Sequence, residues 1–186
     1  MCIENFPCLY SLTCIILVNM NRGESMEHNQ KVREELLESV SYLSDEQLNT
    51  KPEEATWSIM QNLEHLYLME KTIVQRMKQE LKYHSEPTSE VPITVLLNRS
   101  KKVEAPDFLK PSNEFFSLKE MKKKLDSSRE ALINFVANTS EEDLTNRVMT
   151  HRLFGPLCLK QWVELIGYHE QRHLKQIEEV KEALQF

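Results

Sequence analysis

A long apolar stripe near the carboxyl end of the sequence is the feature that most constrains the fold. From Leu159 to Leu184, side chains suited to a protein interior recur every three or four residues, with polar residues between them. Residues at this spacing lie on one face of an α-helix. The sequence therefore predicts a long amphipathic helix whose stripe is Leu159, Trp162, Val163, Ile166, His169, His173, Ile177, Val180 and Leu184.

Three earlier segments show the same helical periodicity. One helix is expected from Met26 onward. Ser58 with Gln61, and Ser117 with Glu120, form capping-box patterns, so two further helices are expected to begin at Ser58 and near Ser117. The apolar stripes of these segments are Val32, Leu36, Val40 and Leu43; Ile59, Leu63, Leu66, Ile73, Met77 and Leu81; and Leu118, Met121, Leu125, Leu132 and Phe135.

The stretch between the second and third of these helices, residues 84–113, contains four prolines. Proline removes a backbone donor and breaks helices, so we expect a long irregular connection here. Three glycines in 186 residues argue against glycine-rich phosphate loops and dinucleotide-binding turns. Four amphipathic helices without strand signals predict an all-α fold, a four-helix bundle with a long connection between helices 2 and 3. Ser140 to Asp143 predicts a short extra helical turn.

Residues 1–25 differ from the rest of the chain. They contain an apolar run that is too short to span a bilayer, and no Lys or Arg precedes it as in a secretory signal. The codons for Arg22-Gly23-Glu24 can form a purine-rich ribosome-binding sequence just ahead of Met26. We therefore expect residues 1–25 to be a leader that is disordered or precedes the native start, and residues 26–186 to form the domain.

The formal net charge of −6 disfavours a general nucleic-acid binder, because neutralising phosphates requires a basic surface. Lysines do cluster at 119–124, but Glu120 and Asp126 accompany them, so we expect a solvated helix face. Only Cys158 lies outside the first 14 residues, which predicts neither a disulfide framework nor a paired-cysteine metal site. A reducing, cytoplasmic location is expected, with neither a membrane nor a nucleic acid as partner.

Two histidines interrupt the stripe of the last helix. His169 and His173 are four residues apart, so their side chains lie one turn apart on the apolar face. Two such imidazoles can share a metal ion, but two hydrogen-bonded core histidines fit the spacing equally well. A metal site needs a further ligand, and His65 at the edge of the second stripe is the best third. The other histidines are two weaker candidates, His151 and His28, and one expected to be solvated, His84.

The segment His169-Glu-Gln-Arg-His173 also matches the H-E-x-x-H motif of zinc proteases, in which the glutamate is the general base. The metzincin continuation requires glycine three residues after the second histidine, where this sequence has Gln176. A zincin also places a sheet beside its active helix, and no strand signals are present. We therefore do not expect protease chemistry.

Two longer segments resemble the DinB-like (DNA-damage-inducible, YfiT-like) superfamily of metalloproteins. Residues 57–66, WSIMQNLEHL, resemble the second-helix signature of that family. Residues 154–157, FGPL, followed by 168–176, YHEQRHLKQ, resemble its closing H-x-x-x-H helix. The resemblance covers about residues 28–184. It implies a four-helix bundle, commonly a homodimer, that binds one metal ion through His65, His169 and His173.

The resemblance also implies the class of chemistry. Relatives include thiol S-transferases that use bacillithiol or mycothiol, and metal-dependent hydrolases, in bacteria. For this chain it implies a divalent ion (Zn, Ni, Mn or Fe), a small electrophilic substrate and, for a transferase, a low-molecular-weight thiol as co-substrate. The alternative is a non-catalytic metal- or ligand-binding protein of the stress response.

The family pattern matches no catalytic residue in this sequence. Glu170 lies near the edge of the last stripe, where it fits either a partner of a metal ligand or an ordinary salt bridge. Glu70 projects into the stripe of the second helix, and both a functional role and a solvent-reaching side chain are open at this point.

Overall fold

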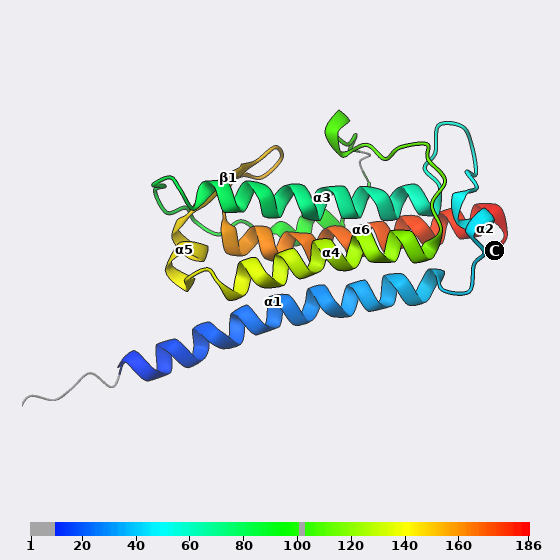
Figure 1. Ribbon diagram of the computed structural model, residues 1–186. Helices are drawn as coiled ribbons and strands as arrows, with labels where there is room; N and C mark the ends of the chain where they lie inside the picture. Colours follow the sequence, from blue (N-terminus) through cyan, green and yellow to red (C-terminus); the bar gives the residue numbers. More distant parts are fainter. Residues whose placement is uncertain (1–9, 101–102) are drawn as a thin grey trace, which may run out of the picture.

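The computed structural model describes the backbone of residues 10–100 and 103–186, and the side chains from residue 23 onward within these ranges. Four long helices lie lengthwise against one another (Figure 1). The outer helix α1 packs along α6, and α3 packs against both α4 and α6. The predicted all-α four-helix bundle is confirmed, and its helices are α1 (Tyr10–Val40), α3 (Ile59–Glu80), α4 (Leu118–Ala137) and α6 (Leu159–Leu184).

The expected helix starts are present with their caps. Ser58 accepts a hydrogen bond from the Gln61 amide, and the Gln61 side chain returns one to Ser58, as the capping-box pattern predicts. Ser117 and Glu120 do the same at α4. The remaining helical elements are short: α2 (Asp45–Asn49), α5 (Glu141–Asn146) and the 3₁₀ turns η1 (Ile93–Leu97) and η2 (Asp107–Leu109). Both 3₁₀ turns belong to the long connection between α3 and α4.

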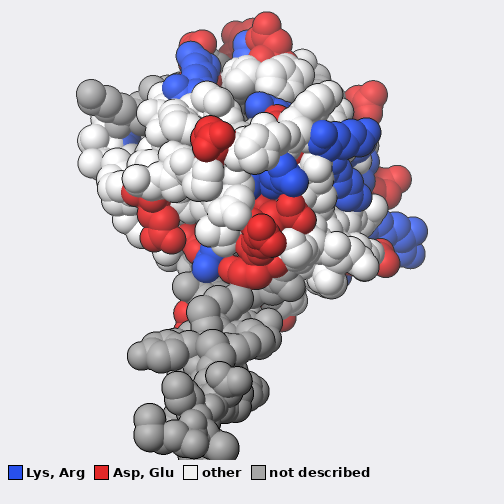
Figure 2. All heavy atoms as spheres, turned by 90° about the vertical axis from the view of Figure 1, so that its left-hand side faces the viewer, with Lys and Arg blue, Asp and Glu red and all other residues white. Residues whose placement is uncertain are grey.

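A small β-hairpin is the element that the sequence reading missed. Strand β1 (Val148–His151) pairs antiparallel with β2 (Gly155–Cys158), and Gly155 adopts a φ of +74° at the start of the second strand. Each strand has only four residues, which is too short for an alternating pattern to be recognised. Figure 2 views the end of the bundle that faces left in Figure 1, where acidic and basic side chains are interspersed among uncharged ones.

Helix α1 begins earlier than the sequence predicted. It starts at Tyr10 rather than at Met26, so residues 10–25 are helical, and their assignment as a leader stays a prediction. Residues 1–9 lie outside the described part of the chain. The native start at Met26 stays a prediction. None of the helices in the described ranges combines the length and apolar character that crossing a membrane requires.

Two apolar clusters form the core. One includes Leu36, Leu63 and Leu125, and the other includes Ile73, Leu132 and Ile166. On each long helix, a charged residue lies in the sequence between residues that pack in one cluster and residues that pack in the other. These four residues, called the ion quartet below, are Arg33 on α1, Glu70 on α3, Arg129 on α4 and Glu170 on α6.

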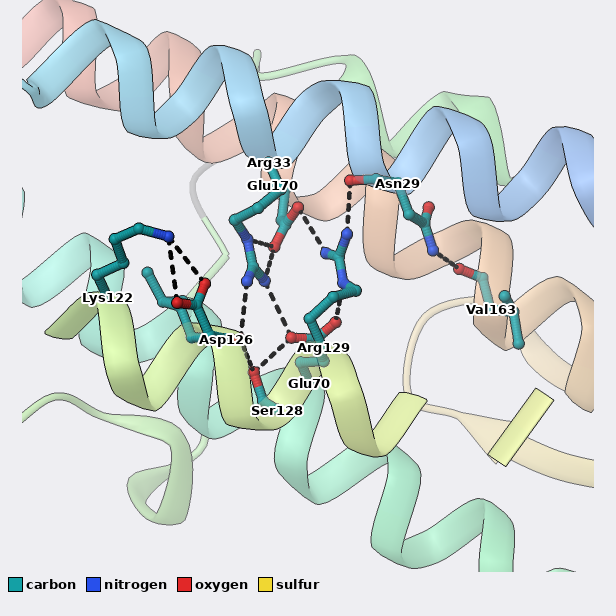
Figure 3. A network of polar contacts seen from close by, with 10 residues as sticks. Asn29, Arg33, Glu70, Lys122, Asp126, Ser128, Arg129, Val163 and Glu170 are labelled. Atoms are coloured by element: carbon teal, nitrogen blue, oxygen red, sulfur yellow. Dashed lines mark hydrogen bonds and ion pairs between the residues drawn. The ribbon is translucent and has the colours of Figure 1, made fainter. Parts of the chain in front are cut away.

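The ion quartet forms a closed set of buried salt bridges (Figure 3). The guanidinium group of Arg33 contacts Glu70 at 2.9 Å and also binds Glu170, and Arg129 contacts the same two carboxylates at 2.7 and 3.0 Å. Ser128 adds a hydrogen bond to Glu70. Burial by itself lowers the pKa of Arg33, but the carboxylates of Glu170 and Glu70 outweigh that effect and raise the pKa. All four long helices are thus joined by one polar layer.

Gly167 allows α1 and α6 to approach closely. A Cβ atom at this position would overlap Oδ1 of Asn29 and come within 2.8 Å of the His28 ring. The Asn29 amide donates a hydrogen bond of 2.9 Å to the carbonyl of Val163, one turn earlier on α6. A side chain at position 167 would therefore force the Asn29 and His28 side chains, or α1 itself, to shift.

Candidate metal centre

His65, His169 and His173 lie together inside the bundle. Each offers one ring nitrogen, and these three atoms lie within 4.8 Å of one another. The ring centroids are 5.2 Å apart for His65 and His169, 4.8 Å for His65 and His173, and 4.6 Å for the pair on α6. Helix α3 supplies the first residue and α6 the other two. The structure thus brings together the three histidines that the resemblance implied, and they are called the histidine cluster below.

All three imidazoles are neutral at physiological pH. Desolvation by burial lowers the pKa of His169 and His173 well below the usual histidine value, and the neighbouring histidines and Arg172 lower it further. Burial also lowers the pKa of His65. Metal ligation requires the unprotonated nitrogen, so this environment favours the form of histidine that binds metal.

Two members of the cluster have a hydrogen-bond partner at Nδ1. His65 Nδ1 lies 2.8 Å from the carbonyl oxygen of Leu109, which belongs to η2 in the long connection. His173 Nδ1 lies 2.9 Å from Oδ1 of Asn62, one turn before His65 on α3. Partners at Nδ1 leave Nε2 as the nitrogen available to a ligand. The donor set of three neutral imidazoles is compatible with one divalent transition metal ion.

The indole ring of Trp57 covers one side of the cluster. Its centroid lies 5.0 Å from that of His65 and 6.4 Å from that of His173, and it is nearly parallel to the His173 ring. Trp57 immediately precedes Ser58, the capping residue of α3, so the helix start fixes its position. The site therefore has an aromatic wall that excludes water from one side.

The long connection is attached to α3 beside the cluster. The carboxylate of Glu64 accepts hydrogen bonds from the backbone amide and the hydroxyl of Ser112, at 2.8 and 3.0 Å. The Gln61 side chain donates to the carbonyl of Ser112 at 2.8 Å. These contacts hold the connection where the carbonyl of Leu109 reaches His65. A segment that the sequence described only as irregular therefore contributes directly to the site.

The other three histidines lie outside the cluster. His151 Nδ1 accepts hydrogen bonds from the amides of Leu153 and Phe154, at 3.1 and 3.2 Å, and so closes the hairpin turn. His28 packs its ring 5.1 Å from Tyr168. His84 is exposed beside Glu86. The two weaker candidates of the sequence reading are thus not brought to the cluster, and His84 is solvated as expected.

The two glutamates left open by the sequence are both structural ion-pair partners. Glu70 and Glu170 each bind both arginines of the ion quartet. Glu64, the carboxylate next to His65, is occupied by Ser112. Although Glu170 directly follows His169, its carboxylate faces Arg33 and Arg129, as in Figure 3. The H-E-x-x-H match therefore has no free glutamate to act as a general base.

Comparison with known sequences identifies relatives that match most of the chain. The Bacillus subtilis protein YuaE is 40% identical over 146 residues, which cover 77% of this chain and 88% of YuaE. A protein of Oceanobacillus iheyensis, provisionally named a metal-dependent hydrolase, is 25% identical over 140 residues, which cover 75% of this chain and 73% of that protein.

Two solved structures share the fold. The four-helix bundle protein TT2238 has a TM-score of 0.59 at 20% identity, covering 85% of this chain and 98% of its own. YfiT from Bacillus subtilis, described as a probable metal-dependent hydrolase with an unusual four-helix bundle topology, has a TM-score of 0.57 at 15% identity, covering 99% and 94%. The profile of the DinB superfamily matches residues 28–177, which include all three clustered histidines. The chain therefore belongs to the DinB superfamily.

Proposed function

We propose that His65, His169 and His173 bind one divalent metal ion, and that the protein is a metal-dependent hydrolase or thiol S-transferase acting on a small electrophilic substrate. The observation that carries this proposal is the convergence of three neutral imidazole nitrogens within 4.8 Å. In the described part of the chain, no other group of histidine, cysteine or acidic side chains comes together in this way.

The donor set limits the choice of ion. Imidazole nitrogens suit Zn, Ni and Fe, whereas Ca, Mg and Mn prefer oxygen ligands. A divalent ion bound by the three histidines would lower the pKa of a water or thiol and so would supply a nucleophile at neutral pH. Zinc is the first ion to test.

The residues of this chain divide the remaining work. His65, His169 and His173 stay neutral because burial lowers their pKa, and so remain competent to bind. Trp57 packs over the rings and restricts the approach of solvent. The carboxylates of Glu64, Glu70 and Glu170 are occupied by other partners, so none of these three is free to act as a base.

That occupation of the carboxylates supports the transferase alternative. Hydrolases of the zincin type rely on a free glutamate to activate water. A thiol co-substrate has an ordinary pKa near 8.5, much closer to neutrality than that of water, and needs less help to ionise. The names of the Oceanobacillus relative and of YfiT support the hydrolase instead. An assay with both nucleophiles distinguishes the two activities.

Metal content tests the site directly. We expect the wild-type protein to retain one equivalent of divalent metal after dialysis, measured by elemental analysis. The double variant His169→Ala and His173→Ala should retain none. His84→Ala serves as the matched control, because His84 is exposed and away from the cluster. Equal metal content in the double variant and the wild type would refute the site.

Turnover tests the reaction. The zinc-loaded protein is offered a panel of small electrophiles, including activated esters, amides and halogenated aromatics, with and without bacillithiol. Product formation that needs bacillithiol identifies a transferase, and product formation without it identifies a hydrolase. A protein that binds metal tightly but turns over none of these supports the non-catalytic alternative, a metal- or ligand-binding protein of the stress response.

Two further expectations belong to this proposal. A homodimer is expected, and light scattering of the purified protein measures it directly. A cytoplasmic location is supported by the single described cysteine, Cys158, which is free and buried. Cell fractionation with an antibody against the native protein tests that location.

A further inference from the structure

The side-chain amide of Asn62 lies between two groups that determine its orientation. Its Nδ2 donates a hydrogen bond of 2.9 Å to the backbone carbonyl of Ser58, and its Oδ1 lies 2.9 Å from Nδ1 of His173. The two ends of an amide are distinguished by their partners. The Ser58 carbonyl can only accept a hydrogen bond, so the amide nitrogen must face it and the oxygen must face His173.

This orientation fixes the position of the proton on His173. The Asn62 oxygen can only accept, so Nδ1 of His173 must carry the hydrogen that it donates. Metal binding requires the neutral form of the ring. A neutral ring has one hydrogen, so Nε2 of His173 presents a lone pair.

The carbonyl of Leu109 acts on His65 in the same way. A backbone carbonyl can only accept, so Nδ1 of His65 donates to it over 2.8 Å and Nε2 is left free. One of these acceptors comes from α3 and the other from the long connection. Both are held in place by further hydrogen bonds, Asn62 through Ser58 and the connection through Glu64 and Ser112.

We propose that Asn62 is a positioning residue of the metal centre, which holds His173 in the Nδ1–H tautomer before any ion arrives. The inference rests on the proposed function, because its purpose is to present Nε2 to a metal ion. Without an acceptor at Nδ1, the proton is free to occupy Nε2, where it blocks ligation. Asn62 itself contacts the ligand His173 and acts through it.

The start of α3 supports this arrangement mechanically. Ser58 is the capping residue, and its backbone amide and hydroxyl are both bound to Gln61 in a capping box. The Ser58 carbonyl therefore cannot shift without uncapping the helix. Asn62 is fully buried, so no solvent competes for its oxygen. One series of hydrogen bonds thus links the cap of α3 through Asn62 to His173.

His151 provides an internal reference for the opposite tautomer. Its Nδ1 accepts hydrogen bonds from the backbone amides of Leu153 and Phe154. In the neutral ring the hydrogen must then lie on Nε2. His151 and His173 are therefore expected to give opposite nitrogen signatures within a single spectrum.

Long-range ¹H–¹⁵N correlation spectroscopy of metal-free wild-type protein labelled on histidine tests the assignment. We expect Nδ1 to be the protonated nitrogen and Nε2 the unprotonated one in His65 and His173, and the reverse in His151. Adding Zn²⁺ should shift Nε2 of His65 and His173 and leave His151 unchanged. A His173 that carries its proton on Nε2 in the metal-free protein would overturn the inference.

Variants test whether the tautomer matters for binding. Asn62→Leu keeps the approximate size but removes the acceptor, and should weaken zinc affinity about 10- to 100-fold, as loss of such partners typically does. Asn62→Asp keeps an acceptor for His173 but loses the donor to the Ser58 carbonyl, and it should bind zinc more tightly than Asn62→Leu does. Asn138→Leu is the control, because Asn138 makes the same amide contact, to Asn134 four residues earlier, away from any clustered histidine. Its affinity should be unchanged.

The outcomes separate this inference from the proposed function. Wild-type protein that binds no zinc would contradict the proposed function. Zinc affinity unchanged in folded Asn62→Leu would leave the metal site in place and contradict only the positioning role. Circular dichroism confirms that each variant is folded, and the metal-free spectrum of the wild type decides the tautomer even where a variant does not fold.

Discussion

Two buried polar groups lie next to each other in this bundle, and they are built on opposite principles. The ion quartet consists of two arginines and two glutamates, each bound to both opposite charges. The histidine cluster consists of three neutral rings that face one another, with a pKa lowered by burial at each. On α6 the two groups are adjacent in sequence, at His169 and Glu170.

The difference supports a structural role for the ion quartet and the proposed metal-binding role for the histidine cluster. Every charge in the quartet is neutralised, and even the remaining donors bind backbone carbonyls, those of Asn29 and Leu125. The arginines and glutamates of the quartet therefore all have partners within the protein, and the quartet serves to specify how the four helices meet. In the histidine cluster, His65 and His173 keep Nε2 available, and packing alone gains nothing from these free nitrogens. The cluster is therefore the part of the interior that a ligand would complete.

Removing one charge of the quartet should have the largest effect. Arg33→Leu leaves Glu70 and Glu170 in the core with Arg129 as the one remaining arginine of the quartet, and should lower the free energy of unfolding by about 3–5 kcal/mol. Urea denaturation measures the loss. The control is Lys122→Met, which removes an exposed salt bridge to Asp126 of 3.1 Å on the same bundle and should cost less than about 1 kcal/mol. An equal loss of unfolding free energy in the two variants would contradict the structural role of the quartet.

Metal binding at the histidine cluster should stabilise the folded protein. Zinc at about 100 times its Kd is expected to raise the free energy of unfolding by about 2.7 kcal/mol, because only the folded state assembles the three ligands. The measurement is the thermal midpoint with and without zinc. His173→Ala should abolish the increase, and His84→Ala should retain it. An increase that survives in His173→Ala would place the ion elsewhere.

Gly167→Ala tests how far both groups depend on the approach of α1 to α6. The new methyl group would overlap Asn29, so we expect a loss of about 1–3 kcal/mol in the free energy of unfolding. Ala is otherwise the better helix former, which by itself would stabilise α6. A net gain in stability would therefore show that the Asn29 side chain or α1 moves aside at little cost.

Replacing a clustered histidine in the metal-free protein should be nearly neutral, in contrast to Arg33→Leu. His169→Leu exchanges a half-buried neutral ring for an apolar side chain of similar size, so the change should stay within about 1.5 kcal/mol in either direction. Chemical denaturation in the presence of a chelator measures it. A loss as large as that of Arg33→Leu would mean that the cluster is itself a structural element.

The smallest effect expected is a pH dependence that belongs to the cluster. The pKa of His169 and of His173 is well below the usual value of about 6.5 in the folded state, so the unfolded chain binds protons that the folded chain does not. Stability of the metal-free protein should therefore fall as pH decreases below about 6.5. Unfolding measured at about pH 7 and about pH 5.5 tests this, and His169→Leu should reduce the difference.

Much of the fold follows from local sequence patterns. The capping boxes at Ser58 and Ser117 give two helix starts, and α6 has the limits that its stripe predicted. The hairpin escaped prediction because its strands are four residues long, and its antiparallel pairing joins residues that no periodicity links. The helical state of residues 10–25 was missed because their composition resembled a leader rather than a bundle helix.

The three clustered histidines could be singled out from the sequence, but their surroundings could not. His169 and His173 stand out as polar residues on an apolar stripe, and their spacing is local. Asn62 and Trp57 lie within the segment that resembles the family, but no sequence spacing relates Asn62 to His173. The role of the Leu109 backbone carbonyl could not be predicted from the type of side chain, because every residue carries a backbone carbonyl.

The sequence by itself determined the helices and the face on which each histidine lies, because both depend on neighbours three or four residues away. Tertiary structure decided which faces meet. It placed Glu70 and Glu170 against two arginines rather than beside the histidines, and it brought an amide from α3 to His173. The physical reason is that burial and hydrogen bonding set the charge and tautomer of a side chain, and both depend on groups distant in sequence.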